Sequence, residues 1–215
     1  MNNTLHDTTA VQVNSHLIEE VRAFSAATLH EASGQYGALP SEIKPISSGM
    51  SICGKATTVL SPPNDNLWLH RALYEAEPGD VLVVDVGLEF EAGYWGDIMT
   101  HAALERGLGG LVINGCVRDL AQIETLNFPI FARGICIHGT GKDHNAAGAI
   151  NVPVRLGNAI IFPGDMIVGD RDGVVSIARS RIADVVQRAK EREEKENRIL
   201  QQLEQGHSTL ELYGW

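Results

Sequence analysis

Two short segments combine residue types that could do chemistry together. Gly96-Asp97 opens a stretch with helical spacing, and Arg118-Asp119 follows a short β-branched run further along the chain. An aspartate offers the hard oxygen ligands that Mg²⁺ and Mn²⁺ accept. An arginine offers a planar cation that suits carboxylate or enolate oxygens. If the two segments meet in space, they would hold a divalent metal and a small oxo-acid between them.

The same residues also have local structural interpretations. Asp97 and Asp119 are both good N-cap residues for a following helix. Arg118 could simply pair with an acidic neighbour. Residue type and spacing alone leave the metal site and these local roles open.

The elements around the two segments predict how they would meet. Val81–Val86 is a near-continuous apolar run, typical of a strand covered on both faces. Gly110–Asn114 and Pro129–Ala132 are the next strands, and helices are expected over Asp97–Arg106 and Leu120–Leu126. Strands and helices that alternate at this spacing form βαβ units with parallel strands. Ligands bind outside the carboxyl ends of such strands, where both segments lie.

The start of the helix expected over Asp97–Arg106 adds an anion-binding feature to this edge. The backbone amides of residues 96–99 should be free there, because the first turn of a helix has no intrahelical partners for them. The helix dipole further favours negative charge. We therefore expect these amides to offer an anion-binding site.

The rest of the chain predicts further helices and a turn-rich β region. Residues 1–14 are polar and expected to be frayed. Helices are expected from Ser15, over Ala26–Ala32 and over Leu67–Ala76, and a strand over Met50–Leu60 with a bulge at Gly54. Glycines and prolines after Gly134 separate short β pieces. These pieces are Ile150–Val154, Asn158–Phe162, Met166–Val168 and Val174–Ala178.

The last helix, about Arg181 to Gln205, changes character part-way. Ile182, Val185, Val186 and Ala189 give its first half an apolar stripe, which Lys190–Arg198 lacks. One interpretation is a solvated face with mutually supporting charges. The other is that this segment lies against a neighbouring subunit.

Composition restricts the class of protein. With 215 residues and 44% hydrophobic content, the chain fits one globular domain spanning residues 1–215. A net charge of −10 argues against nucleic acid as a partner. No apolar run is long enough to span a bilayer, and no signal peptide is expected at the N-terminus. Cys53, Cys116 and Cys136 form no CxxC pair, so we expect reduced thiols in a soluble, cytoplasmic protein.

Three other motifs fail on inspection. Gly107–Val112 begins like a dinucleotide fingerprint but precedes a strand. Gly139–Asp143 resembles a P-loop but lacks its first glycine and its hydroxyl residue. Cys136, His138 and His144 lack a fourth zinc ligand at a suitable spacing. No nucleotide or zinc site is predicted.

The segment GYWGDIMTHAALERGLGGLVINGCVRD resembles the RraA-like superfamily, and especially its metal-dependent pyruvate aldolases. These act on 4-hydroxy-4-methyl-2-oxoglutarate and 4-carboxy-4-hydroxy-2-oxoadipate. The likeness extends over most of the chain, through ATLHEASGQYGAL, PNDNLWLHRAL, PGDVLVV, FPIFARG, GAINVPV and PGDMIVGDRDGVV. The glycine-acid loop and the VRD segment, at their separation, are its specific part.

The resemblance implies roles for individual residues. Asp119 corresponds to the direct metal ligand, and Arg118 to the substrate-binding arginine. Asp97 would also hold a water of the metal. Glu194, or its neighbours Glu191 and Glu193, would complete the site from the C-terminal helix of an adjacent subunit. The loop whose amides hold the substrate carboxylate corresponds to Gly96, Asp97, Ile98 and Met99.

The resemblance also implies a fold and an activity. The fold would be a three-layer β/β/α arrangement of the swivelling-domain type, assembled as homotrimers or homohexamers with sites between subunits. The activity would be Mg²⁺- or Mn²⁺-dependent cleavage of a 4-hydroxy-2-oxo acid to pyruvate in aromatic catabolism, with oxaloacetate decarboxylation beside it. The alternative within the superfamily is a non-catalytic regulator that binds and inhibits ribonuclease E. Asp170-Arg171-Asp172, often a fully acidic triplet in the family, leaves the substrate open.

Overall fold

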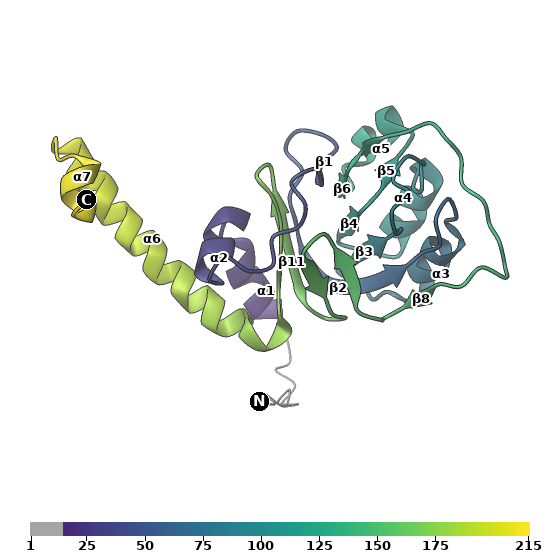
Figure 1. Ribbon diagram of the computed structural model, residues 1–215, viewed down its shortest axis with the longest axis horizontal. Helices are drawn as coiled ribbons and strands as arrows, with labels where there is room; N and C mark the ends of the chain where they lie inside the picture. Colours follow the sequence, from purple (N-terminus) through teal and green to yellow (C-terminus); the bar gives the residue numbers. More distant parts are fainter. Residues whose placement is uncertain (1–14) are drawn as a thin grey trace.

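An eight-stranded sheet forms the centre of the molecule (Figure 1). The computed structural model describes residues 15–215, and the segment predicted to be frayed, residues 1–14, lies outside them. The strands follow the order β1-β6-β4-β3-β2-β11-β12, and β8 pairs with β2. Their bounds are β1 Lys44–Pro45, β2 Ile52–Leu60, β3 Val81–Asp85, β4 Gly110–Ile113, β6 Ile130–Ala132, β8 Ala149–Ile150, β11 Met166–Asp170 and β12 Gly173–Ile177.

The middle of the sheet confirms the predicted βαβ units. Strands β2, β3, β4 and β6 run parallel, with Val83 beside Thr58 on one neighbour and Val112 on the other. Helices α3 (Leu67–Glu75), α4 (Asp97–Glu105) and α5 (Leu120–Leu126) connect these strands. They cover one face of the sheet (Figure 1). All four residues from Val81 to Val84 are buried, as expected for a strand covered on both faces.

A small β layer covers the opposite face. The antiparallel hairpin of β9 (Val154–Leu156) and β10 (Ala159–Ile161) packs Leu156 and Ile161 into a core with residues of the large sheet. The resulting β/β/α layering is the predicted fold class. Strands β5 (Cys116–Val117) and β7 (Gly134–Ile135) form a further parallel pair.

The β piece predicted over Ile150–Val154 is wrong as one strand. β8 ends at Ile150 and pairs with β2, whereas β9 starts at Val154 and pairs with β10. Asn151 between them has a positive φ of 58°, and Pro153 has no amide proton for a ladder. These two residues end one strand before the next begins.

A second set of helices packs on β2, β11 and β12. It consists of α1 (Ser15–Arg22), α2 (Ala26–Ala32) and the first half of α6 (Ile182–Glu204). Beyond Ala189, no residue of α6 is fully buried, and the helix projects away from the sheet (Figure 1). The short helix η1 (Arg179–Arg181) precedes α6, and α7 (Thr209–Tyr213), which we did not predict, follows it. A capping box between Ser208 and Glu211 starts α7.

Gly54 does not mark a bulge. The pairing of β2 with β11 continues without interruption from Lys55–Met166 through Gly54–Ile167. A Cβ atom at Gly54 would lie 2.4 Å from the carbonyl oxygen of Gly79. The glycine is therefore explained by a close backbone approach.

No helix within residues 15–215 is both long and apolar enough to cross a membrane.

Candidate active site

The two segments meet at the carboxyl edge of β3 and β4, as predicted. A carboxylate oxygen of Asp119, Oδ2, accepts a hydrogen bond from the backbone amide of Asp97 at 3.2 Å. The backbone amide of Arg118 donates to the carbonyl oxygen of Trp95 at 2.9 Å. The start of α4 and the start of α5 are thus joined directly.

Two buried aromatic residues anchor the loop before α4 in the core. Tyr94 and Trp95 are fully buried. The hydroxyl of Tyr94 donates to the carbonyl oxygen of Glu89 at 2.6 Å and accepts from the amide of Asn64 at 2.9 Å. The indole nitrogen of Trp95 donates to the hydroxyl of Thr100 at 2.8 Å. These contacts fix the loop on both sides of its glycines.

The flanking glycines make room for the second segment. A Cβ atom at Gly96 would lie 2.3 Å from Oδ2 of Asp119. A Cβ atom at Gly93 would lie 3.1 Å from both Cβ and Cδ of Arg118, and 2.6 Å from the carbonyl oxygen of Cys136. Both positions therefore require glycine because of close packing, and neither has a positive φ.

Asp119 is not a conventional N-cap. It precedes α5 in the left-handed region, with φ of 62° and ψ of 37°, and its side chain makes no capping hydrogen bond. This backbone conformation costs a non-glycine residue about 1 kcal/mol or more. The carboxylate instead points to the start of α4, where it is one-third exposed. A local capping role does not explain this residue.

Arg118 keeps its terminal nitrogens available. Its side chain is about half exposed, and its Nε lies 3.6 Å from Oδ2 of Asp119, beyond hydrogen-bond distance. Among residues 15–215, neither terminal nitrogen has a hydrogen-bond partner. The pairing with an acidic neighbour is therefore weak, and the guanidinium can bind a further anion.

The expectation of free amides at residues 96–99 is wrong for two of them. The amide of Asp97 donates to Asp119, and the amide of Ile98 donates to Oδ1 of Asp97 at 2.7 Å. Both acceptors are carboxylates, because the positive end of the helix dipole and its unpaired amides favour them. Ile98 is 76% exposed at this rim, whereas Met99 is buried.

Three residues of this site were missed by the sequence analysis. Asn66, His70 and Lys142 line the same cavity, which has a volume of about 160 Å³. The complete lining is Asn66, His70, Gly93, Gly96, Asp97, Ile98, Met99, Arg118, Asp119 and Lys142.

Asp65 places Lys142 in the cavity. This buried carboxylate accepts from the amides of Asp143 and Leu67, so it joins the loop that carries Lys142 to the start of α3. The amide of Gly141 donates to the carbonyl oxygen of Asn64 at 2.7 Å. The segment that superficially resembled a P-loop thus contributes a cation to this site.

The cavity keeps one histidine neutral. Burial lowers the pKa of His70 first, and the positive charge of Lys142 lowers it further. The imidazole is therefore uncharged at neutral pH and can accept a proton.

The carboxylates of Asp97 and Asp119 suit Mg²⁺ or Mn²⁺ better than they suit a metal that takes all its ligands from the protein. Asp119 makes no hydrogen bond through Oδ1 to any residue from 15 to 215, and it lies beside Asp97. The same part of the chain contains no group of three His, Cys, Asp or Glu that could hold a metal. Mg²⁺ typically binds one or two carboxylates and takes its other ligands from water and substrate. The residues present fit such an ion.

Glu194 does not reach this site within one chain. It is exposed on the projecting part of α6, and α6 packs at the β11–β12 end of the sheet, away from α4 and α5 (Figure 1). Glu191 accepts a hydrogen bond from Gln187 of the same helix. Any contribution of this charged run to a site requires a second subunit.

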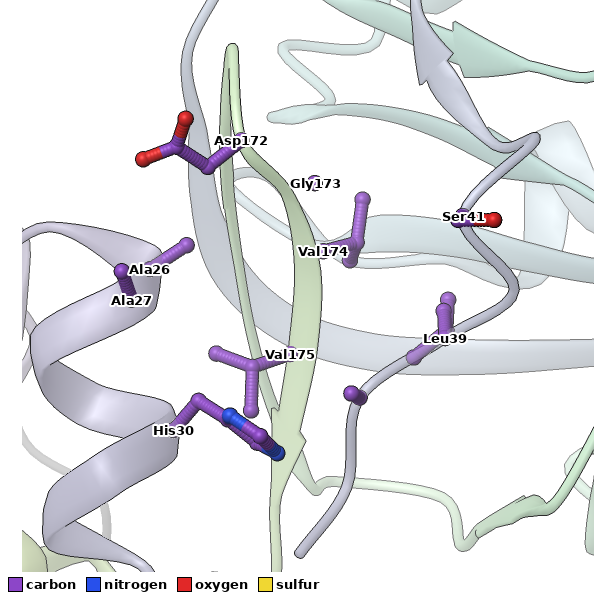
Figure 2. Close-up of a pocket in the computed structure, with 10 residues that line it drawn as sticks. Ala26, Ala27, His30, Leu39, Ser41, Asp172, Gly173, Val174 and Val175 are labelled. Carbon is purple, nitrogen blue, oxygen red and sulfur yellow. The ribbon is translucent and has the colours of Figure 1, made fainter. Parts of the chain in front are cut away.

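A larger cavity elsewhere in the molecule has fewer side chains that could take part in chemistry. It has a volume of about 280 Å³ and lies between α2, residues 38–41 and β12 (Figure 2). Ala26, Leu39, Val174 and Val175 make its walls mainly apolar, with His30 at one side (Figure 2). Its lining includes the carboxylate of Asp172 but no arginine beside it.

Comparison with known proteins assigns the family. A family model described as RraA-like, Aldolase/RraA, matches residues 5–176. The chain belongs to the RraA-like family. A relative from Halalkalibacterium halodurans, named "Putative 4-hydroxy-4-methyl-2-oxoglutarate aldolase", is 37% identical over 182 residues, which cover 85% of this chain and 86% of the relative.

Solved structures of similar proteins agree with the RraA-like fold. An uncharacterized protein from Pseudomonas syringae is 28% identical, covers 99% of both chains and superposes with a TM-score of 0.85. Streptomyces coelicolor RraAS2, described as an unusual member of the RNase ES inhibitor RraA protein family, is 28% identical with a TM-score of 0.74. That likeness covers 86% of this chain and 95% of RraAS2.

Replacing Asp119 with alanine is expected to abolish Mn²⁺ binding, because it removes the partly exposed carboxylate that is held between the two loops. Electron paramagnetic resonance of free Mn²⁺ measures this directly, without an activity assay. Asp172→Ala, which removes an exposed carboxylate from the β11–β12 turn, is the matched control and should bind like the wild type. Equal binding by Asp119→Ala and wild type would contradict the metal assignment.

Proposed function

We propose that this RraA-like protein is a divalent-metal-dependent carbon–carbon lyase. It would cleave a 4-hydroxy-2-oxo acid, of the 4-hydroxy-4-methyl-2-oxoglutarate or 4-carboxy-4-hydroxy-2-oxoadipate type, to pyruvate and a second oxo-acid. The observation that carries the proposal is the direct contact between Asp119 and the start of α4, with the Arg118 guanidinium beside it. The name of the Halalkalibacterium relative supports the same reaction class.

The chain's own residues would bind the pyruvyl end of the substrate. Arg118 offers two terminal nitrogens to a carboxylate or a 2-oxo oxygen. The first turn of α4 offers amides, one of which now binds the Asp97 side chain and would be released to a substrate carboxylate. Asp119, with Asp97 nearby, would hold Mg²⁺ or Mn²⁺, and the bound ion would supply Lewis-acid stabilisation of the developing enolate.

Bond cleavage needs a proton acceptor and a stabiliser of negative charge. Removal of the C4 hydroxyl proton breaks the C3–C4 bond and leaves the electron pair on the pyruvate enolate. Asp97 and the neutral His70 are the groups of this cavity suited to accept that proton. Arg118 would stabilise the enolate oxygen where its charge develops. Water held at Asp97 would then protonate the enolate carbon.

The same arrangement would also decarboxylate oxaloacetate. Loss of carbon dioxide from oxaloacetate forms the same pyruvate enolate, so it needs the same stabilisation by Arg118. We therefore propose oxaloacetate decarboxylation as a second activity of this site.

The second carboxylate of the substrate would bind at Lys142. This cation lines the cavity together with Arg118, and the pair balances the charges of Asp97 and Asp119 before a substrate enters. A dianionic substrate plus a divalent cation would keep the site close to neutral. This balance favours a substrate with a second acid group.

A regulatory function is the second candidate. The similarity to RraAS2 favours it, and the net charge of −10 would suit docking to a basic partner such as a ribonuclease E-type protein. A binding protein does not require the left-handed Asp119 or the close approach at Gly96. Metal-dependent release of pyruvate from these substrates distinguishes the two functions.

Replacing Arg118 with alanine is expected to lower kcat by about 100-fold or more, as loss of an oxyanion stabiliser does elsewhere. The measurement is pyruvate release from 4-hydroxy-4-methyl-2-oxoglutarate and from oxaloacetate, with Mg²⁺ or Mn²⁺ restored after chelation. Arg171→Ala removes an exposed arginine outside the cavity and should retain activity. Near-normal turnover of Arg118→Ala at saturating substrate would refute its role, and activity that survives chelation would refute the metal dependence.

Replacing Lys142 with alanine is expected to raise KM for 4-hydroxy-4-methyl-2-oxoglutarate by roughly tenfold, because a charge-assisted contact is lost. KM for 4-hydroxy-2-oxopentanoate, which carries a hydrogen atom in place of the second carboxylate, should change little. The pKa of His70, measured by NMR titration, should rise because a neighbouring positive charge is removed. Equal KM increases for both substrates would show that Lys142 does not recognise the second carboxylate.

We also propose that Glu194 of one subunit completes the site of another in a homotrimer or homohexamer. Co-expressed Arg118→Ala and Glu194→Gln chains should then recover activity that neither variant has alone, because some hybrid sites contain both intact residues. The same experiment with Glu191→Gln or Glu193→Gln tests the neighbouring positions. A fully active Glu194→Gln homo-oligomer would show that Glu194 does not complete the site and belongs to a solvated helix face.

A further inference from the structure

A second cavity opens at the carboxyl edge of the parallel strands, on the hairpin side of the sheet. It has a volume of about 360 Å³ and receives Asp85 from the end of β3, Asn114 from just after β4 and Arg133 from just after β6. Arg155 of β9 faces it from the hairpin. Carboxyl ends of parallel strands are the usual ligand-binding edge of such sheets, and this volume falls within the range of small-molecule sites.

Arg133 is held in a fixed orientation. Its side chain is only 19% exposed. Its Nε donates to Oδ1 of Asn114 at 2.7 Å, and its guanidinium carbon lies 4.1 Å from the centre of the Phe90 ring. One terminal nitrogen, Nη1, lies 3.7 Å from Glu42, a mostly exposed residue, and this exceeds hydrogen-bond distance. The orientation of the guanidinium is thus fixed without using its terminal hydrogen bonds.

The cavity contains more donors than acceptors. Because Asn114 must present its oxygen to Nε of Arg133, its amide nitrogen is left as a donor. Within residues 15–215, this nitrogen, the terminal nitrogens of Arg133 and the guanidinium of Arg155 make no hydrogen bonds. The single lining carboxylate, Asp85, already accepts from the amide of Gly87. Hydrogen-bond donors without acceptors, beside the two arginines, favour the binding of an anion.

We propose that this cavity binds a small carboxylic acid, at a position separate from the Arg118-Asp119 site. The planar fork of Arg133 matches a carboxylate in a bidentate manner. Phe90 and Leu88, which also line the cavity, offer apolar surface to the body of the acid. The proposal does not depend on the lyase activity.

The two cavities share their supporting segments. The loop from Gly87 to Phe90 continues into Gly93 and Gly96, and Asn114 is followed by Arg118 and Asp119. The amide of Cys116 donates to the carbonyl oxygen of Phe90 at 3.0 Å, which joins the two segments between the cavities. An acid bound at Arg133 therefore contacts the same backbone that positions the candidate active site.

The test uses butyrate as the probe and butanol as its uncharged counterpart. The full-length protein is treated with chelator, dialysed to remove it, and titrated while backbone amide signals are followed by NMR. Saturable shifts are expected at residues 87–90, 114–116, 133 and 155–157 with butyrate, and none with butanol. An absence of saturable shifts at these residues with millimolar butyrate would overturn the proposal.

Variants separate this cavity from the Arg118-Asp119 site. Arg155→Gln, at an exposed position, and Arg133→Lys, which keeps the charge but loses the fork, should each weaken butyrate binding by about fivefold or more. Arg171→Gln is the exposed control, and it and Arg118→Gln should bind butyrate like the wild type. Binding that is lost in Arg118→Gln but retained in both cavity variants would place butyrate in the other site and refute the proposal.

Discussion

The candidate active site depends on a backbone approach that leaves no space for a side chain. Gly96 lies so close to Asp119 that a single added carbon would overlap the carboxylate, and Gly93 is packed in the same way against Arg118. Between these glycines, Tyr94 and Trp95 extend into the core and are fully buried. The two aromatic rings anchor the loop in the core, and the two glycines let Arg118 and Asp119 pack against its other side.

This approach is possible because β3 and β4 are parallel neighbours. Their carboxyl ends leave the sheet at one edge, so the loop before α4 and the loop before α5 emerge side by side. The left-handed backbone of Asp119 then turns its carboxylate toward α4 and away from its own helix. A conformation with a positive φ at this non-glycine residue is maintained by these contacts, as is common where strain serves a site.

Local sequence patterns predicted the strands and helices around the site. Long-range contacts determine which further residues line it. The bounds expected for α2 and α5 agree with the structure, in which α2 lies between Ser25 and Ser33 and α5 between Asp119 and Asn127. The meeting of Asp97 and Asp119 followed from the parallel arrangement. Lys142 could not be predicted in this way, since its position depends on Asp65, far away in the chain. The occupied amides at α4 depended on side-chain rotamers that no sequence pattern specifies.

The last helix shows why the proposed site between subunits is physically reasonable. An isolated helix in water needs roughly 12 to 15 residues to be even marginally stable, and α6 loses its buried stripe after Ala189. Its outer part is supported by an ion pair of 2.8 Å between Arg192 and Glu196, and by Lys195 over the ring of Tyr213. Tyr213 belongs to α7, so this contact places α7 against the outer part of α6. The charged segment can therefore remain helical before a second subunit binds. A preformed arm loses less conformational entropy on docking than a disordered tail would.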